Sequence, residues 1–180
     1  MNMLAVIAAL VFVADQIAKW LVLARFRPHE EKQVIGRFFE LTLEFNPGAA
    51  WGMFARFGHS NTILTAFSIA TLIALWLMRR ALAATSLPHR VAFGLIVGGI
   101  FGNLADRVQH GCVVDFLYFY LGPYYAQWTG GSGHWPAFNI ADSAICTGVM
   151  LYAWVSLWPH KPRVVPELPP NRKFGAPPTP

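Results

Sequence analysis

Four long apolar stretches alternate with polar segments along the chain, and each stretch is about as long as a membrane-crossing helix. Such a helix needs about 20 consecutive, mostly apolar residues. The pattern places these helices at about residues 3–24, 62–78, 91–109 and 139–158. We therefore predict an all-α integral membrane protein, with residues 1–158 forming one domain of four transmembrane helices.

A shorter pattern predicts a strand between the first two helices. Polar and apolar residues alternate from Glu40 to Phe45, as in a half-buried strand. The turn residues Asn46, Pro47 and Gly48 then end this pattern. Residues 49–54 are small and aromatic, which suits the lipid interface. We expect about residues 25–58 to form a small β-sheet that rests on the membrane.

The polar segment before the last helix, residues 109–137, is rich in tyrosine, tryptophan and glycine. Aromatic side chains of this kind lie at the level of the lipid headgroups. The glycines at residues 130, 131 and 133 would permit a mobile lid. The composition favours an ordinary interfacial loop over a lid.

The composition agrees with a membrane protein. Only 13% of residues are charged and 55% are hydrophobic, with a mean hydropathy of +0.42, whereas soluble domains carry about 25% charged residues. No basic block is interleaved with base-stacking aromatic residues, so we predict no nucleic-acid partner. Cys112 and Cys146 do not make a disulfide framework. Cys146 lies in an apolar run and is expected to be a small buried thiol.

Basic residues predict the orientation of the chain in the membrane. The loop after the second helix contains Arg79, Arg80 and Arg90, and the proline-rich tail, residues 159–180, contains four more basic residues. The positive-inside rule places this loop and both termini in the cytoplasm. The tail is predicted to be disordered. The first helix has no basic segment before it and no clear cleavage site, so we expect it to be retained.

Two aspartates lie beside apolar residues at the predicted outer edge of the membrane. Asp115 follows Val113 and Val114, and Asp142 begins the fourth apolar stretch. An ionisable group next to hydrocarbon is costly, so such a residue is a candidate for function. The alternatives are a helix-capping role for Asp142 and a surface-loop position for Asp115.

An aspartate pair can hydrolyse a peptide bond without a cofactor. Two carboxyl groups held close together share one proton. The ionised acid can activate water, while the protonated acid polarises the carbonyl and later protonates the leaving amine. Asp142 lies in the first turn of a helix, where the dipole favours negative charge, and we expect it to be the more acidic of the two. The sequence contains neither His-Glu-x-x-His nor Gly-x-Ser-x-Gly, and we predict no metal site.

Other polar and small residues lie within the apolar stretches. Asp15 and Lys19 are four residues apart, so they can pair on one helical face, either as a structural ion pair or as part of a functional site. In the third stretch Asn103 and Arg107 share one face, with Asp106 beside it. The same helix has glycines at residues 94, 98 and 102, which predict close packing against a neighbouring helix.

Five segments of the chain resemble, in order and spacing, the motifs of signal peptidase II, the family of bacterial lipoprotein signal peptidases. The segments are residues 15–19, 45–52, 98–107, 113–116 and 138–143. The resemblance covers about residues 15–145 and departs from the usual pattern at Ile100, while Pro47 occupies a variable position. The tail lies outside it.

The resemblance implies a four-helix aspartyl endopeptidase of the bacterial inner membrane, with a small sheet and the active site on the periplasmic side. It implies cleavage of prolipoproteins just before a cysteine that carries a diacylglyceryl group, and no cofactor. Asp115 and Asp142 would be the catalytic dyad. The residues implied to hold the substrate are Asn46, Asn103, Arg107 and Asn139, and those implied as supporting polar residues are Asp15, Lys19 and Asp106. The expected partners are lipid-modified prolipoproteins and membrane phospholipids, and the expected state is a monomer.

Two other functions remain open from the residues alone. In a proton-coupled carrier, Asp15, Lys19, Asp106 and Arg107 would form a relay, because intramembrane ionisable groups often mark such pathways. The sequence shows no inverted repeat of the kind that many transporters have. In a membrane scaffold, the glycine-bearing face would serve assembly.

Overall fold

The computed structural model describes residues 3–48, 59–83, 86–129 and 131–158. Along the chain these residues form α1 (Met3–Arg25), β1 (Lys32–Ile35), β2 (Phe39–Asn46), α2 (Ser60–Ala83), α3 (Leu87–His110), β3 (Val113–Tyr120), α4 (Pro123–Thr129), β4 (His134–Phe138) and α5 (Ile140–Leu157). The small aromatic segment at residues 49–54, the glycine at 130 and the proline-rich tail lie outside the described residues.

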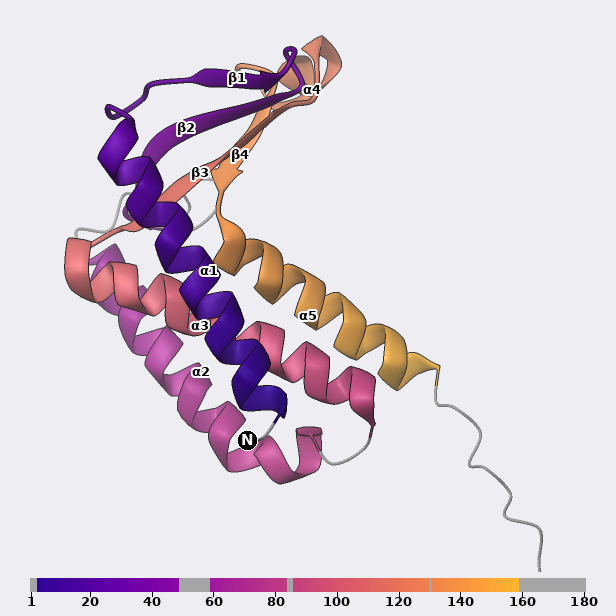
Figure 1. Cartoon of the computed structure of the whole chain (residues 1–180). Coiled ribbons are helices and arrows are strands. Elements are labelled where there is room, and N and C mark those ends of the chain that lie inside the picture. Colours follow the sequence, from indigo (N-terminus) through magenta and orange to yellow (C-terminus); the bar gives the residue numbers. More distant parts are fainter. Residues whose placement is uncertain (1–2, 49–58, 84–85, 130, 159–180) are drawn as a thin grey trace, which may run out of the picture.

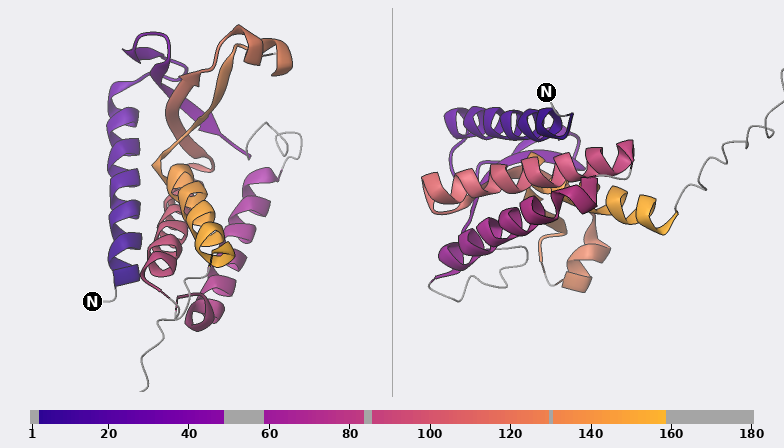
Figure 2. Two further views of the ribbon diagram at one scale, coloured as in Figure 1. Left: turned by 90° about the vertical axis from the view of Figure 1, so that its right-hand side faces the viewer. Right: turned by 90° about the horizontal axis from the view of Figure 1, so that it is seen from below.

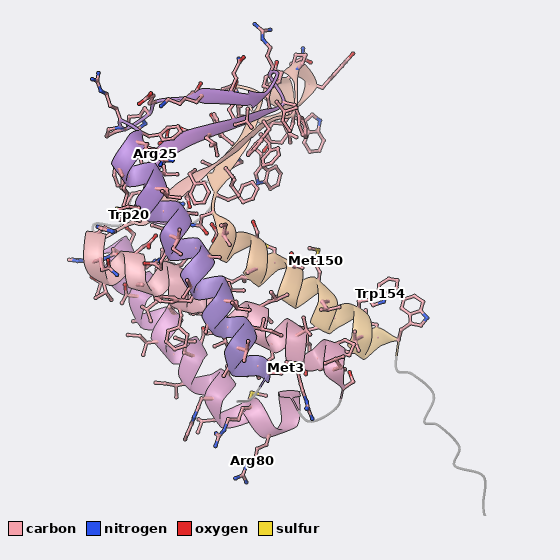
Figure 3. All side chains as sticks on the ribbon, in the orientation of Figure 1. Met3, Trp20, Arg25, Arg80, Met150 and Trp154 are labelled. Carbon is pink, nitrogen blue, oxygen red and sulfur yellow. The ribbon has the colours of Figure 1, made fainter. Side chains whose placement is uncertain are left out.

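Four of these helices, α1, α2, α3 and α5, are long and apolar enough to cross a membrane. They run between the sheet and the opposite end of the molecule, where the N-terminus lies (Figure 1). Large side chains such as Trp20, Met150 and Trp154 are exposed on the outside of the helices (Figure 3). The predicted combination of four membrane helices with a small sheet is confirmed.

Helix α3 lies at the centre of the bundle. It packs against α1, α2 and α5, and the view along the helices shows it between α1 and α2 (Figure 2). The glycine-bearing face explains how α1 comes so close. A Cβ atom on Gly98 would lie 2.6 Å from the carbonyl oxygen of Ala8, and one on Gly102 would lie 2.6 Å from Oδ2 of Asp15. The predicted packing role of these glycines is confirmed.

The sheet contains four antiparallel strands in the order β1-β2-β3-β4. Asn46 pairs with Val113 and Glu44 with Asp115, so the end of β2 lies beside the start of β3. The strand predicted at residues 40–45 is present as part of β2. The segment at residues 109–137, for which the sequence predicted no strand or helix, supplies β3, α4 and most of β4. The first four residues of β3 are all buried, so they lack the alternation by which a half-buried strand is recognised.

A small apolar core joins the sheet to the first helix. Val22 on α1, Leu43 on β2, and Val114 and Phe116 on β3 form one buried cluster. Helix α5 begins two residues after β4 ends. Because α1 and α5 are both held at the sheet, the start of β3 lies where the strands meet the helices.

We expect Gly98→Ala to destabilise the protein by roughly 1–3 kcal/mol, since the added methyl group would press on backbone atoms of Ala8 that cannot yield cheaply. Helix propensity alone would favour alanine by about 1 kcal/mol, so the direction of the change identifies the contact. Thermal unfolding in detergent micelles measures it. Val108→Ala, at an exposed position of the same helix, is the control; a Gly98→Ala variant as stable as wild type would contradict the close packing.

Candidate active site

A buried lysine joins two aspartates between α1 and α3, near the ends of these helices that face the sheet. Nζ of Lys19 on α1 lies 2.7 Å from Oδ2 of Asp15 and 2.8 Å from Oδ2 of Asp106 on α3. It also donates to Oδ1 of Asn103 at 3.1 Å. The three hydrogens of the ammonium group therefore have three acceptors. The side chains of this lysine and both acids are at most 3% exposed.

The same two acids hold the backbone of two other elements. Oδ1 of Asp15 accepts the N–H of Ala141 on α5 at 2.9 Å, and Oδ2 of Asp106 accepts the N–H of Val114 on β3 at 3.0 Å. The lysine-centred cluster, defined as Asp15, Lys19 and Asp106, thus ties α1, α3, α5 and β3 together.

Gln16 completes this cluster and was not among the predicted site residues. Its Nε2 lies 3.0 Å from Oδ1 of Asp106, 3.3 Å from Oδ2 of Asp15 and 3.3 Å from the carbonyl oxygen of Gly102. Its place three residues before Lys19 on a helix was the available signal, because residues three apart share a face.

Asp142 is held by the start of α5. The side chain of Asn139 accepts the N–H of Asp142 at 2.9 Å, and Oδ2 of Asp142 accepts the N–H of Asn139 at 3.3 Å. This reciprocal pair is a capping box. The capping role considered for Asp142 is therefore real. Its Oδ1 accepts a further bond of 2.7 Å from Nδ2 of Asn103, so capping is only part of its environment.

Asp115 lies in β3 and its residue is 2% exposed, so the surface-loop position considered from the sequence is wrong. Its Oδ2 accepts a bond of 3.0 Å from Nδ2 of Asn46, at the end of the neighbouring strand. Its Oδ1 accepts a bond of 2.7 Å from Nδ2 of Asn139. Since the N–H of Val114 is fixed by Asp106, both the backbone before Asp115 and its carboxyl group are held in place.

The two candidate acids belong to one hydrogen-bonded network and line one cavity. Asn139 donates to Asp115 and approaches Oδ1 of Asn103 at 3.1 Å, and Asn103 in turn donates to Asp142. Asp115 and Asp142 both border a cavity of about 880 Å³ between the sheet and the helices. The structure therefore brings together the two acids that the sequence suggested as a pair.

Arg107 supplies positive charge to this cavity. It lines the cavity and donates to the carbonyl oxygen of Asn103, one turn earlier, at 3.4 Å. Asn46 and Asn103 also line the cavity, whereas Asn139 is fully buried behind it. Within the described ranges, no three His, Cys, Asp or Glu side chains are grouped as metal ligands.

Apolar and aromatic residues form much of the remaining wall. They include Phe45, Val113, Tyr118, Trp135 and Phe138. Cys146 also lines the cavity and is exposed, so the prediction of a buried thiol was wrong. It lies four residues after Asp142 and therefore on the same face of α5, which an apolar run alone does not reveal.

The environment of Asp115 opposes its ionisation. Burial raises the pKa of this carboxyl group from 3.8 to about 7, and the negative charge of Asp142 acts in the same direction. The hydrogen bonds from Asn46 and Asn139, and the charge of Lys19, lower the pKa in part. Asp115 can therefore carry a proton near neutral pH.

We expect Lys19→Met to destabilise the protein by roughly 3–5 kcal/mol, because it leaves two buried carboxylates without their counter-ion. Thermal unfolding in micelles measures the loss. Lys32→Met, which removes a lysine from an exposed ion pair with Glu30, should have little effect. A triple variant that also carries Asp15→Asn and Asp106→Asn should recover much of the stability; equal stability of the Lys19→Met and Lys32→Met variants would contradict the role of Lys19.

The raised pKa of Asp115 predicts a stability that depends on pH. Between about pH 4 and 7 the folded protein keeps a proton that the unfolded chain has released, so the free energy of unfolding contributed by this group falls as pH rises through that window. Asp115→Asn should remove this contribution, and its stability relative to wild type should rise from pH 4 to 7 and then level off. Unfolding measured at several pH values tests this, with Glu31→Gln as control; identical pH slopes for wild type and Asp115→Asn would contradict it.

Comparison with known proteins places the chain in a family. The family model described as signal peptidase (SPase) II matches residues 7–158. A lipoprotein signal peptidase of Desulforapulum autotrophicum is 43% identical over 159 residues, covering 84% of this chain and 89% of that protein. A lipoprotein signal peptidase of Azoarcus sp. (strain BH72) is 44% identical over 170 residues, covering 91% of this chain and 89% of that protein.

Two solved structures, both described as bacterial membrane enzymes, have the same fold. Each aligns with a TM-score of 0.75, at 32% and 31% identity, covering 88% and 89% of this chain and 89% and 96% of the solved chains. The match to the family model, at residues 7–158, extends from α1 to the end of α5. The chain therefore belongs to the signal peptidase II family of bacterial membrane proteases.

Proposed function

We propose that the protein is an aspartic endopeptidase that removes the signal peptide from diacylglyceryl-modified prolipoproteins, cutting just before the lipidated cysteine. The single observation that carries this proposal is the position of Asp115 and Asp142 on one cavity, joined through Asn103 and Asn139. The names of the relatives, lipoprotein signal peptidases, supply the substrate class.

In this proposal the two acids have different roles. Asp142, held by the first turn of α5, is the ionised member and takes a proton from the attacking water. Asp115, whose pKa is raised to about 7, is the protonated member. It polarises the scissile carbonyl and then transfers its proton to the leaving amine, while Asp142 holds the proton taken from water. The balance of protons is kept within the pair, and no cofactor takes part.

The asparagines and the arginine divide into two groups by their position. Asn46, Asn103 and Arg107 reach the cavity, where their polar groups can satisfy the backbone of an extended peptide that has left the lipid. Asn139 is fully buried and bonds to Asp115 and Asp142. We therefore assign Asn139 to positioning the dyad and the other three to the substrate. The lysine-centred cluster holds the backbone directly before each acid of the dyad.

The position of the cavity suits a substrate that arrives from the bilayer. It lies where the sheet meets the membrane helices, so it can receive both a membrane-embedded peptide and the water needed for hydrolysis. Arg80 lies at the end of the molecule opposite the sheet (Figure 3). With basic residues facing the cytoplasm, the sheet and the dyad would face the periplasm and both termini the cytoplasm.

We expect Asp115→Asn and Asp142→Asn each to reduce cleavage of a diacylglyceryl-modified prolipoprotein by at least about 10²–10⁴-fold, the usual contribution of acid–base catalysis. The measurement is the rate of signal-peptide release by purified protein in lipid nanodiscs. Thermal unfolding establishes that both variants are folded.

Glu31→Gln, which removes an exposed acid outside the cavity, is the matched control and should keep full activity. Wild-type activity in either Asn variant would overturn the dyad. Proton flux into liposomes in the absence of cleavage would instead favour a proton-coupled carrier.

A further inference from the structure

A second cavity lies at the end of the helix bundle away from the dyad. It measures about 630 Å³ and is bordered by α1, α2 and α3. Its apolar wall includes Leu72 and Leu75 on α2, and Phe93, Val97 and Phe101 on α3. The three residues on α3 are four apart and so lie along one face of the helix. None of these side chains belongs to the candidate active site.

Three arginines border the same cavity at one end. Arg79 and Arg80 lie in the last part of α2, and Arg90 lies in the first turn of α3. Because the two helices are antiparallel neighbours, the arginines gather at the same level, and Figure 3 places Arg80 at the end opposite the sheet. The sequence has no aspartate or glutamate between Glu44 and Asp106, so the segment that carries the three arginines is basic.

One of these arginines is held against the cavity wall. The guanidinium of Arg79 lies 4.1 Å from the ring centre of Trp76, and its Nη1 donates to the carbonyl oxygen of Trp76 at 2.6 Å. Trp76 itself lines the cavity. A guanidinium has five N–H donors in a planar fork that matches a phosphate group. The contacts with Trp76 thus position the guanidinium of Arg79 without neutralising its positive charge.

The cavity is polar at one end and apolar along its length. From Leu72 to Arg80 it follows α2 for about 12 Å, at 1.5 Å per residue. The arginines lie at the end of the membrane-spanning segment, and the leucines and phenylalanines lie toward its middle. This is the polarity of a phospholipid, whose phosphate lies at the interface and whose acyl chains point toward the centre of the bilayer.

We propose that this cavity is a binding site for one anionic phospholipid of the leaflet opposite the dyad. The arginines bind the phosphate and the negatively charged headgroup, and an acyl chain occupies the apolar space between α2 and α3. The lipid would fill the groove beside α2, because only 6% of the membrane-spanning window of α2 is buried within the protein. The site is independent of the proposed proteolysis.

Native mass spectrometry of the full chain, titrated with phosphatidylglycerol or with phosphatidylcholine of the same acyl chains, tests this proposal. We expect retention of one phosphatidylglycerol in preference to phosphatidylcholine. A triple Arg79→Gln, Arg80→Gln, Arg90→Gln variant should lose affinity by about fivefold for each arginine, the usual contribution of a basic side chain near an anionic surface. Soluble glycerol phosphate should not displace the lipid, because it lacks the acyl chains.

The matched control removes the same charge at the other end of the molecule through Arg25→Gln, Arg27→Gln and Arg37→Gln, and should leave the affinity unchanged. Val97→Trp should weaken binding with all arginines present by filling the apolar part of the cavity. Equal binding of the two lipids, or equal losses in the two triple variants, would overturn the site. Displacement by glycerol phosphate would show an anion site without a lipid.

Discussion

The buried ammonium group of Lys19 is the interaction on which the rest of the structure depends. A charge within the bundle is tolerable only if it is paired and hydrogen-bonded, because desolvation otherwise costs several kcal/mol. Asp15 and Asp106 pair with it from two different helices. Helices α1 and α3 must therefore pack closely together at the level of Lys19. The glycine face of α3 permits that meeting, since Gly102 leaves room for the carboxyl group of Asp15. Close packing and charge neutralisation therefore require the same geometry.

The cluster also fixes the end of the molecule that carries Asp115 and Asp142. Each of its acids accepts the backbone N–H of the residue directly before one member of the proposed dyad: Ala141 precedes Asp142, and Val114 precedes Asp115. One buried charge system thus positions two short backbone segments that come from different elements. Asn139 then sets the carboxyl groups relative to each other, because it caps the helix of one acid and donates to the other.

The sequence predicted the features that follow from local chemistry. Helix number follows from the lengths of the apolar stretches, and the candidate acids stood out because a carboxyl group beside hydrocarbon is costly. Features that depend on tertiary contacts were harder to predict. Buried and exposed residues do not alternate at the start of β3, because α1, α3 and β2 surround it near Asp115. Cys146 differs from the expected buried thiol because one face of the apolar helix α5 borders a cavity. Gln16 was passed over because only folding brings its amide to Asp106.

Two pairs of aspartates, Asp15 with Asp106 and Asp115 with Asp142, differ in how their charge is compensated. Asp15 and Asp106 share the ammonium group of Lys19, which neutralises charge directly. Asp115 and Asp142 receive hydrogen bonds mainly from neutral asparagine amides, which stabilise a carboxylate without supplying a countercharge. A pair so placed is stabilised by keeping a proton, and a shared proton is what acid–base catalysis by two carboxyl groups requires. The difference in compensation therefore favours a structural role for the first pair and supports the proposed reactivity of the second.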